Sequence, residues 1–232
     1  MNPTTTVSCG PEGLDAALRR GDIAVIVDVL RFSSTATTAV ANGFAVRPRS
    51  RPPEGDAPRR MGLSPLDYLD PKDPGEVLLV SPNGAFLAER IGVNDAGFIG
   101  CFLNGRTVAR IASAVALKEG RNITLVAAGE IEEDLSDGVR RPRFAVEDWL
   151  GCGHILSGMR MERSAEAEVC ARTYDSCKMA LVDLVKGSLS GRYLIGRGKE
   201  CDISHCLQRD IYDVVPVVLD GVIVRQKEEP YG

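Results

Sequence analysis

The sequence lacks the features that would tie it to a membrane or to secretion. No apolar run approaches the ~18 residues that a membrane-spanning helix needs, and the first residues do not show the basic-then-apolar order of a secretory signal. The seven cysteines are odd in number and lack the regular spacing of a secreted disulfide framework. We therefore expect a soluble, cytoplasmic protein with reduced thiols and no membrane partner.

The usual signatures of phosphate chemistry are also absent. The chain has no GxxxxGK[ST] loop, no GxGxxG and no GxSxG, and no strand is followed by Asp-x-Asp. No cysteine has an arginine six positions later, which excludes a thiolate phosphatase loop. The segment from Gly191 to Gly196 only approximates a phosphate loop. If the protein is an enzyme, its site is therefore an uncommon one.

Positive charge does not dominate the chain. The net charge is −4 and the 28 Lys and Arg residues are scattered, which argues against a nucleic-acid partner. One cluster lies among prolines, and it is open to interpretation as a solvated loop or as an anion patch. Its members are Arg47, Arg49, Arg51, Arg59 and Arg60. A chain of 232 residues with 44% hydrophobic residues can bury a substantial core, and we expect one domain over residues 1–232.

Apolar runs followed by polar turns and helices recur along the chain. Residues 23–27 are a continuous apolar run, typical of a strand buried on both faces. Ser33, Ser34 and Thr35 then offer N-cap hydroxyls, and the helix should end at Asn42-Gly43. Further strands are predicted at 77–80, 97–101 and 123–128, with helices ending near 91 and 118. This order predicts an α/β fold with a mostly parallel or mixed sheet and helices on both faces.

The remaining segments differ in character. Residues 44–75 and 132–143 are polar and irregular, and both are interpreted as loops. Residues 144–161 and 165–186 are each predicted to form one helix. Asp220-Gly221 between two apolar runs predicts a C-terminal β-hairpin.

Polar side chains follow four of the predicted strands, where ligands bind in open α/β sheets. They are Asp28, Arg31, Ser33, Ser34 and Thr35 after the first strand, then Ser81 with Asn83, Asn104, and Glu130. A helix N-terminus suits an anion such as phosphate, and a guanidinium can grip its oxygens. Asp28, expected at an exposed strand end, is placed to bind a metal or to act as a nucleophile or base.

Structural roles compete with these functional ones. The hydroxyls of Ser33 to Thr35 could only cap the helix, Asp28 could only pair with Arg31, and Asn83 could only form a turn. Acidic residues such as Glu147 and Asp148 favour any helix N-terminus, and His154 suits a packing role better than a catalytic one. The expected convergence of several polar sets on one sheet edge favours the functional interpretation.

Several short motifs carry a family resemblance when they are read in order. They are Val27-Asp28-Val29-Leu30-Arg31 with Ser33-Ser34-Thr35, Ser81-Pro82-Asn83-Gly84-Ala85, Cys101-Phe102-Leu103-Asn104, Glu147-Asp148 with Gly151-Cys152-Gly153, Ser190-Gly191-Arg192, Gly196, Asp202, Cys206, Asp210 and Val215-Pro216. Together they resemble the 2-phosphosulfolactate phosphatase family, the magnesium-dependent acid phosphatases of coenzyme M biosynthesis. The resemblance implies that a phosphate ester of a small sulfonated or carboxylated hydroxy acid is hydrolysed with Mg²⁺.

Residue chemistry and placement then assign roles within this expected site. Asp28 and Arg31 are assigned as catalytic, and Glu147 and Asp148 as ligands of Mg²⁺, with Glu130 in reserve. Asp202 is a second reserve ligand. The phosphate-binding set is Ser33, Ser34, Thr35, Asn83 and Asn104. The expected partner is the small phosphorylated or sulfonated acid, and a homodimer is left open.

The chain also departs from the family pattern. Phe32 stands where the family usually has a smaller residue, and the family's longer middle stretch, with a Gly-Phe-Asp-Leu-Gly-Asn-Ser-Pro motif, is reduced here to Met61-Gly62-Leu63-Ser64-Pro65. Two hypotheses are therefore carried forward. The first is an active phosphatase, and the second is a catalytically silent relative that binds a small anion as a sensor or subunit.

Overall fold

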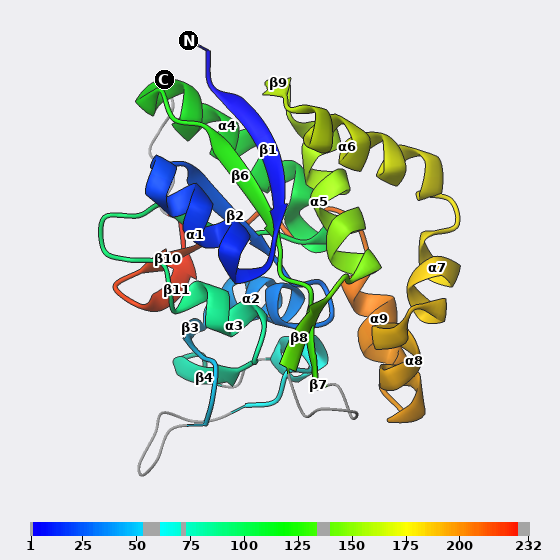
Figure 1. Cartoon of the computed structure of the whole chain (residues 1–232). Coiled ribbons are helices and arrows are strands. Elements are labelled where there is room, and N and C mark those ends of the chain that lie inside the picture. The colour runs from blue at the N-terminus through cyan, green and yellow to red at the C-terminus, as the bar shows by residue number, and fades with distance from the viewer. Residues whose placement is uncertain (1, 53–60, 71–72, 134–139, 227–232) are drawn as a thin grey trace.

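A nine-stranded sheet organises the described part of the chain. The computed structural model describes residues 2–52, 61–70, 73–133 and 140–226 (Figure 1). In spatial order the strands are β4 (Glu76–Val80), β3 (Ala45–Arg49), β11 (Val222–Arg225), β10 (Pro216–Leu219), β5 (Gly97–Ile99), β2 (Ile23–Val27), β6 (Ile123–Ala127), β1 (Thr4–Cys9) and β9 (Glu162–Arg163).

The sheet is mixed, as the predicted fold class allows. Strands β5, β2, β6, β1 and β9 are parallel to one another. The pairs β5–β10, β10–β11 and β11–β3 are antiparallel, whereas β3 and β4 are parallel. Strands β3 and β4 consequently run against the direction of β2.

Helices cover both faces of this sheet. One face carries α1 (Gly10–Arg20), α2 (Phe32–Ala41) and α3 (Gly84–Ala88), with the short turn η1 (Pro65–Tyr68) beside them. The other face carries α4 (Gly105–Glu119), α5 (Val146–Gly158), α6 (Ala165–Cys177), α7 (Leu181–Gly187), α8 (Leu189–Gly196) and α9 (Glu200–Cys206). Each face encloses its own apolar core, which confirms the predicted α/β arrangement.

Strand β2 shows why the sequence of this sheet reads as continuous apolar runs. Ala24 and Ile26 pack into one core, whereas Val25 and Val27 pack into the other. Because successive side chains of a strand point to opposite faces, a strand covered on both sides needs an apolar residue at every position.

The C-terminal hairpin is also as predicted. Asp220 and Gly221 join β10 to β11 with φ angles of 51° and 74°. Both central residues of a type I′ turn need a positive φ, which Asp-Gly supplies at low cost.

The loop predicted for residues 132–143 is wrong at its two ends, which belong to a second, two-stranded sheet, while residues 134–139 lie outside the described residues. Strands β7 (Glu130–Glu133) and β8 (Arg140–Arg143) pair antiparallel beside the main sheet. Their sequences, EIEE and RRPR, lack the apolar alternation by which a strand is recognised.

The predicted irregular segment 44–75 also contains a strand. Val46 and Pro48 of β3 face inward, while Arg47 and Arg49 form ion pairs with Glu76 and Glu89. The first two arginines of the basic cluster therefore belong to a paired strand and not to a solvated loop. Of the others, Arg51 is exposed, and Arg59 and Arg60 lie outside the described residues.

The single helix predicted over residues 165–186 is broken in two. Helix α6 ends at Cys177 and α7 begins at Leu181. A straight helix of that length would extend for about 33 Å. The break instead returns Leu181 and Val185 to the core that holds Tyr174.

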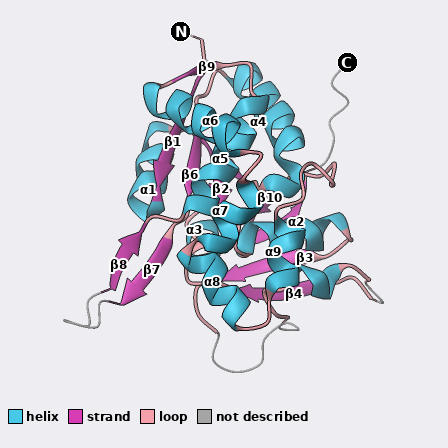
Figure 2. Cartoon of the chain, turned by 90° about the vertical axis from the view of Figure 1, so that its right-hand side faces the viewer, coloured by secondary structure: helices cyan, strands magenta, loops and turns pink. Residues whose placement is uncertain are grey.

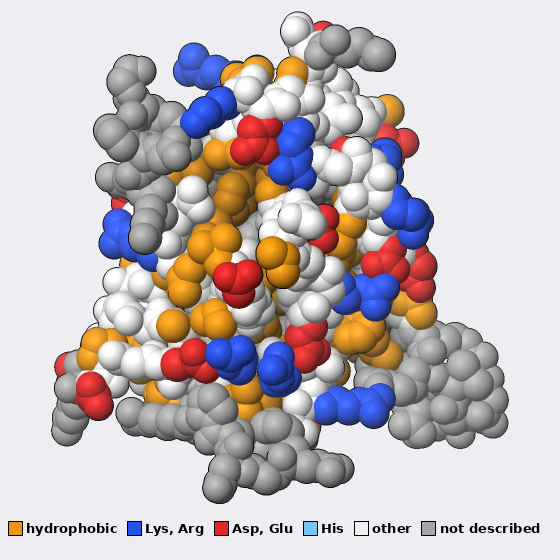
Figure 3. All heavy atoms as spheres, turned by 90° about the vertical axis from the view of Figure 1, so that its left-hand side faces the viewer, with side chains coloured by type: hydrophobic (Ala, Val, Ile, Leu, Met, Phe, Trp, Pro, Cys, Tyr) orange, Lys and Arg blue, Asp and Glu red, His pale blue; other side chains and the backbone are white. Residues whose placement is uncertain are grey.

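The described surface is mixed in charge on the side shown in Figure 3, where Lys and Arg side chains alternate with Asp and Glu. None of the helices in the described ranges is both long and apolar enough to cross a bilayer.

Candidate active site

Asp28 lies immediately after β2 and is held by two helix starts. Its Oδ1 accepts a hydrogen bond from the Phe32 amide at 3.2 Å, and its Oδ2 accepts one from the Gly84 amide at 2.8 Å. The side chain is only 5% exposed, so the expectation of an exposed strand end is wrong. Burial raises the pKa of Asp28 to about 6, although these amides favour its charged form. The charge of Glu147 also contributes to this raised pKa.

Arg31 does not neutralise Asp28. Its guanidinium Nη1 forms an ion pair with Oδ2 of Asp202, on α9, and Asp202 is buried. The alternative in which Asp28 merely pairs with Arg31 is therefore wrong. Asp28 remains a buried carboxyl that accepts hydrogen bonds from two backbone amides and from the Ser81 side chain.

Glu130 and Asn83 meet beside Asp28. The Asn83 Nδ2 donates to Glu130 Oε2 at 2.6 Å, while Asn83 Oδ1 is buried without a hydrogen-bond partner among the described residues. Burial raises the pKa of Glu130 to about 7, and the charge of Asp28 adds to this rise. Two carboxyls with displaced pKa values thus share one corner of the structure, as active sites often arrange.

Two further carboxyls lie in the first turn of α5. Asp148 accepts from the Val29 amide at 2.8 Å and from the Gly129 amide at 2.9 Å, and it thereby joins the loops after β2 and β6. Burial and the charges of Asp28 and Glu147 raise the pKa of Asp148 well above its usual value. Glu147 is 1% exposed, and its Oε2 has no hydrogen-bond partner in the described part of the chain.

Asp28, Arg31, Asn83 and Glu130 border a cavity of about 590 Å³, whereas Glu147 and Asp148 are not among its lining residues. Its lining is Asp28, Leu30, Arg31, Leu63, Ser81, Pro82, Asn83, Glu130, Arg143, Leu189, Ser190, Tyr193 and Leu194. A smaller hollow of about 350 Å³ adjoins it and shares Arg31 and Leu63 as lining residues. The cavity thus combines carboxyls, guanidinium groups and amides with an apolar wall, the usual make-up of a small-molecule site.

The twist of the sheet helps to explain how Asn83 reaches Asp28. Because β4 runs against β2, its end would lie at the opposite edge of a flat sheet. A twist of roughly 20–25° per strand accumulates to roughly 100–125° over the five steps from β4 to β2. Figure 2 shows β3 and β4 lying across the direction of β1 and β6. Helix α3 then returns toward α2 and places Gly84 against Asp28.

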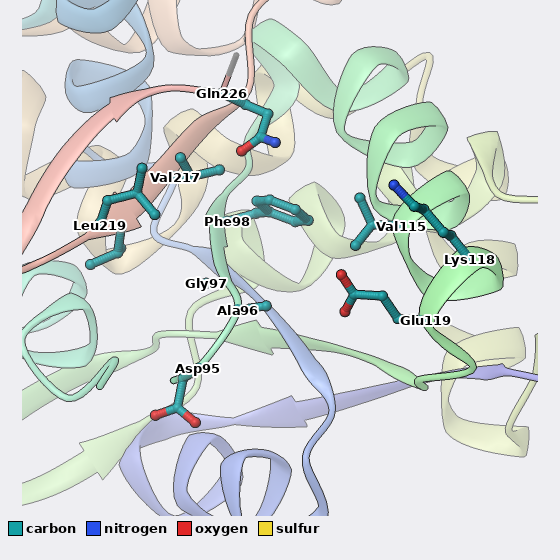
Figure 4. A pocket seen from close by; sticks show the side chains of 11 residues that line it. Asp95, Ala96, Gly97, Phe98, Val115, Lys118, Glu119, Val217, Leu219 and Gln226 are labelled. Atoms are coloured by element: carbon teal, nitrogen blue, oxygen red, sulfur yellow. The ribbon is translucent and has the colours of Figure 1, made fainter. Parts of the chain in front are cut away.

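A third cavity, of about 240 Å³, lies elsewhere (Figure 4). Phe98 and Val217 of the sheet and Val115 of α4 line it, with Glu119 at the end of that helix. It lies at the start of β5, away from the strand end that carries Asp28, and it contains none of the predicted site residues.

Comparison with known proteins identifies the family of this chain. The sequence model of the 2-phosphosulpholactate phosphatase family matches residues 57–221, most of the chain. The chain belongs to this family. A 2-phosphosulfolactate phosphatase of Methanothermobacter thermautotrophicus is 29% identical over 226 residues, covering 89% of this chain and 91% of that protein. A probable 2-phosphosulfolactate phosphatase of Thermotoga petrophila is 28% identical over 222 residues, covering 87% and 91%.

Membership confirms the resemblance and the predicted enzyme class, because this is a family of phosphoric monoester hydrolases. The shortened middle stretch does not remove the chain from the family. Leu63, from that stretch, still lines the cavity, so the reduced segment remains part of the site wall.

The hydroxyls predicted to bind phosphate are held inside the protein. Ser33 Oγ accepts from the Asp28 amide at 2.9 Å, Ser34 Oγ donates to Val29 O at 2.8 Å, and Thr35 Oγ1 donates to Leu63 O at 2.7 Å. The N-cap of α2 is Arg31, without a side-chain cap, so the capping interpretation is wrong. Their role toward phosphate stays a prediction, and this packing does not favour it.

Asn104 is similarly engaged. Its Oδ1 accepts from the Cys101 amide at 3.0 Å, and its Nδ2 donates to Val214 O at 3.1 Å. It does not line the cavity, whereas Asn83 does. His154 packs against Phe102 and Tyr174, as its structural interpretation predicts.

Sequence reasoning missed the far wall of the cavity. Arg143 lies at the end of β8, where a loop was predicted, and Ser190 and Tyr193 lie on α8. Their only sequence signal was the Ser190-Gly191-Arg192 motif, which the family resemblance includes without a role.

Gly84 offers a direct test of the close packing around the Asp28 carboxyl. A Cβ on Gly84 would lie 2.4 Å from a Phe32 ring carbon and 2.6 Å from Asp28 Oδ2. We expect Gly84→Ala to displace the carboxyl, to destabilise the protein by about 1–3 kcal/mol and to reduce turnover strongly. Urea unfolding and phosphate release measure the two effects. Gly75→Ala, where a Cβ meets nothing within 4 Å, is the control. Wild-type turnover in Gly84→Ala would show that turnover does not need the close packing of Gly84 against Asp28.

Proposed function

We propose that the protein hydrolyses the phosphate ester of a small sulfonated or carboxylated hydroxy acid such as 2-phosphosulfolactate. The observation that carries this proposal is the pair of carboxyls, the buried Asp28 and the half-buried Glu130, in one cavity with Arg31. Their raised pKa values place a proton acceptor and a proton donor near neutral pH. The names of the relatives in Methanothermobacter and Thermotoga support the substrate class.

The two carboxyls divide the proton transfers of a hydrolysis. Asp28, the group with the lower pKa, accepts a proton from the attacking water while the new P–O bond forms. Glu130, still protonated near pH 6.5, donates its proton to the leaving oxygen as the ester P–O bond breaks. The products are the free hydroxy acid and inorganic phosphate, and the two carboxyls exchange protons with solvent before the next turnover.

Arg31 is placed to hold the phosphoryl group. Arg31 lines the cavity, and its ion pair with Asp202 holds the guanidinium at the cavity wall instead of letting it extend into solvent. Charge-assisted hydrogen bonds from guanidinium to phosphate would stabilise charge on the non-bridging oxygens in the transition state. Asn83 Nδ2 orients Glu130 through its 2.6 Å hydrogen bond.

The carboxyl cluster suits Mg²⁺, which the family resemblance implies. Glu147 Oε2 is a buried oxygen without a partner, and Asp148 keeps lone pairs beyond its two backbone contacts. Among the described residues no three His, Cys, Asp or Glu side chains form a ready metal site. A Mg²⁺ ion commonly uses one or two carboxylates plus water and phosphate oxygens, so Glu147 and Asp148 would suffice. When bound, it would polarise the phosphoryl oxygens.

Phosphate release from a panel of small phosphate esters, with Mg²⁺ or after EDTA treatment, tests the proposal. We expect release from phosphorylated small acids only in the presence of the divalent cation. Full activity after EDTA treatment would exclude a requirement for the metal but would still support the proposed hydrolysis. Binding of the acids without release from any ester would instead favour a catalytically silent relative.

Substitution of Arg31 has a graded expected outcome. Arg31→Ala should reduce kcat/KM about 10- to 100-fold, because each charge-assisted hydrogen bond is worth about 1.5–3 kcal/mol. Arg31→Lys should recover only part of this, because an ammonium does not reproduce the planar fork. Steady-state kinetics on the preferred ester measure both. A lysine variant equal to wild type would reduce Arg31 to a charge partner of Asp202.

A further inference from the structure

The guanidinium of Arg31 is connected to two residues that the proposed chemistry does not use. Asp202 Oδ2 receives the guanidinium, and Asp202 Oδ1 accepts a hydrogen bond from Ser64 Oγ at 2.7 Å. The three residues come from the start of α2, the segment before η1 and helix α9. Asp202 lies 138 positions after Ser64 and 171 positions after Arg31 in the sequence, so only the fold brings the three residues together.

This chain of contacts is largely buried. Asp202 is 2% exposed and Ser64 is 6% exposed, whereas the Arg31 side chain is 18% exposed toward the cavity. A buried carboxylate needs its partners, because removing one leaves an uncompensated charge. Asp202 therefore fixes one side of the guanidinium and leaves its other edge to the cavity.

The segment that carries Ser64 is tied to the same place by a second contact. Thr35 Oγ1 donates to Leu63 O at 2.7 Å, and Leu63 lines the cavity beside Arg31. The reduced middle stretch thus supplies both part of the cavity wall and the hydroxyl behind Asp202.

From these contacts we infer that Asp202 and Ser64 are positioning residues, which hold the Arg31 guanidinium against the transferred phosphoryl group. This inference rests on the proposed function. Asp202 is assigned here to Arg31, because its Oδ2 contacts the guanidinium directly while its Oδ1 accepts from Ser64. Ser64 acts through Asp202, and neither residue touches the substrate.

Asp202→Asn tests the inference, because asparagine keeps an oxygen for Ser64 and removes the charge that holds Arg31. We expect kcat to fall about tenfold or more, with KM changed less than about threefold. Since Asp202 acts through Arg31, adding Asp202→Asn to Arg31→Ala should reduce kcat by less than about twofold. Ser64→Ala should lower kcat several-fold, and Ser64→Thr, which keeps the hydroxyl, should restore it.

The chain offers a matched control at the other end of β2. Asp22 is also 2% exposed, pairs with Arg20 at 2.7 Å and accepts from the Thr124 hydroxyl at 2.7 Å. Asp22→Asn removes the charge of an equally buried carboxylate, whose arginine partner is half exposed and lies outside the cavity, so it should lower thermal stability and leave kcat and KM unchanged. A fall in kcat for Asp202→Asn no greater than that for Asp22→Asn would reduce Asp202 to a structural residue.

Two further outcomes would overturn the inference, and both differ from failure of the proposed function. The first is an equal loss of kcat from Asp202→Asn in the presence and absence of Arg31. The second is a loss from Ser64→Ala that Ser64→Thr does not restore. If the wild-type protein releases no phosphate from any ester, the proposed function fails. The wild type, the single variants Asp202→Asn and Arg31→Ala, and the double variant are then compared by their affinity for inorganic phosphate, measured by calorimetry. An effect of Asp202→Asn that persists in Arg31→Ala overturns the positioning role there as well.

Discussion

Glu130→Gln is expected to lower kcat by about 100- to 10,000-fold while making the protein more stable at pH 8. Glutamine cannot donate the proton that the leaving oxygen needs. Its amide oxygen can still accept the hydrogen bond from Asn83 Nδ2, so the local packing should survive. Phosphate release and urea unfolding on the same preparations measure the two effects.

The pH dependence of this stability gain has a definite sign. Burial raises the pKa of Glu130 from 4.5 to about 7, so the folded protein keeps a proton that the unfolded chain has lost. The contribution of Glu130 to stability is therefore full below pH 4.5 and is lost as pH rises through 7. A shift of this size corresponds to up to about 3 kcal/mol. Glutamine avoids that loss, so Glu130→Gln should gain stability at pH 8 and nothing at pH 4.

The rate profile provides an independent check on the same group. Wild-type activity should fall below pH 6, where Asp28 gains a proton, and above pH 7, where Glu130 loses one. The residual activity of Glu130→Gln should lack the alkaline fall. Glu162→Gln, at an exposed position in β9, is the control and should change neither property. Retention of the alkaline fall in Glu130→Gln would assign it to another group.

The parts of this site that sequence predicted are those with local signals. Asp28 follows a strand whose five residues are all buried, and that run is visible without a structure. The end of α2 at Asn42 and the Asp220-Gly221 hairpin follow from the conformational preferences of single residues. Hydrophobic pattern and turn chemistry act over a few residues, which is why these predictions succeed.

Contacts between distant segments were not predictable in the same way. The expected convergence is correct for Asp28, Asn83 and Glu130 but not for Asn104, which does not line the cavity. Three antiparallel pairs also reverse the direction of β4, which the sequence did not indicate. Sequence also cannot distinguish a cap hydroxyl from one that bonds inside a loop, as Ser33 and Ser34 do. The partner of Arg31 lies 171 positions away, where no local pattern marks it.

Asp28→Asn should lower turnover to a similar extent as Glu130→Gln, but unlike that variant it should lose stability at low pH. Both Asp28 oxygens accept backbone amides, from Phe32 and Gly84. Asparagine has one oxygen, so its NH₂ group must face one of these N–H donors. An unsatisfied buried donor costs about 1–3 kcal/mol, and we expect this loss at pH 4.

At pH 8 a second effect offsets that cost. Burial raises the pKa of Asp28 from 3.8 to about 6, so its contribution to stability is full below pH 3.8 and is lost as pH rises through 6. That loss amounts to about 3 kcal/mol in wild type and is absent in Asp28→Asn. The variant should therefore be less stable than wild type at pH 4 and about equal to it at pH 8.

Urea unfolding at the two pH values measures this difference in stability, with Asp175→Asn at an exposed position as control. Turnover near the wild-type rate would exclude Asp28 as the base, whereas a stability loss equal at both pH values would mean that its carboxyl is ionised without penalty.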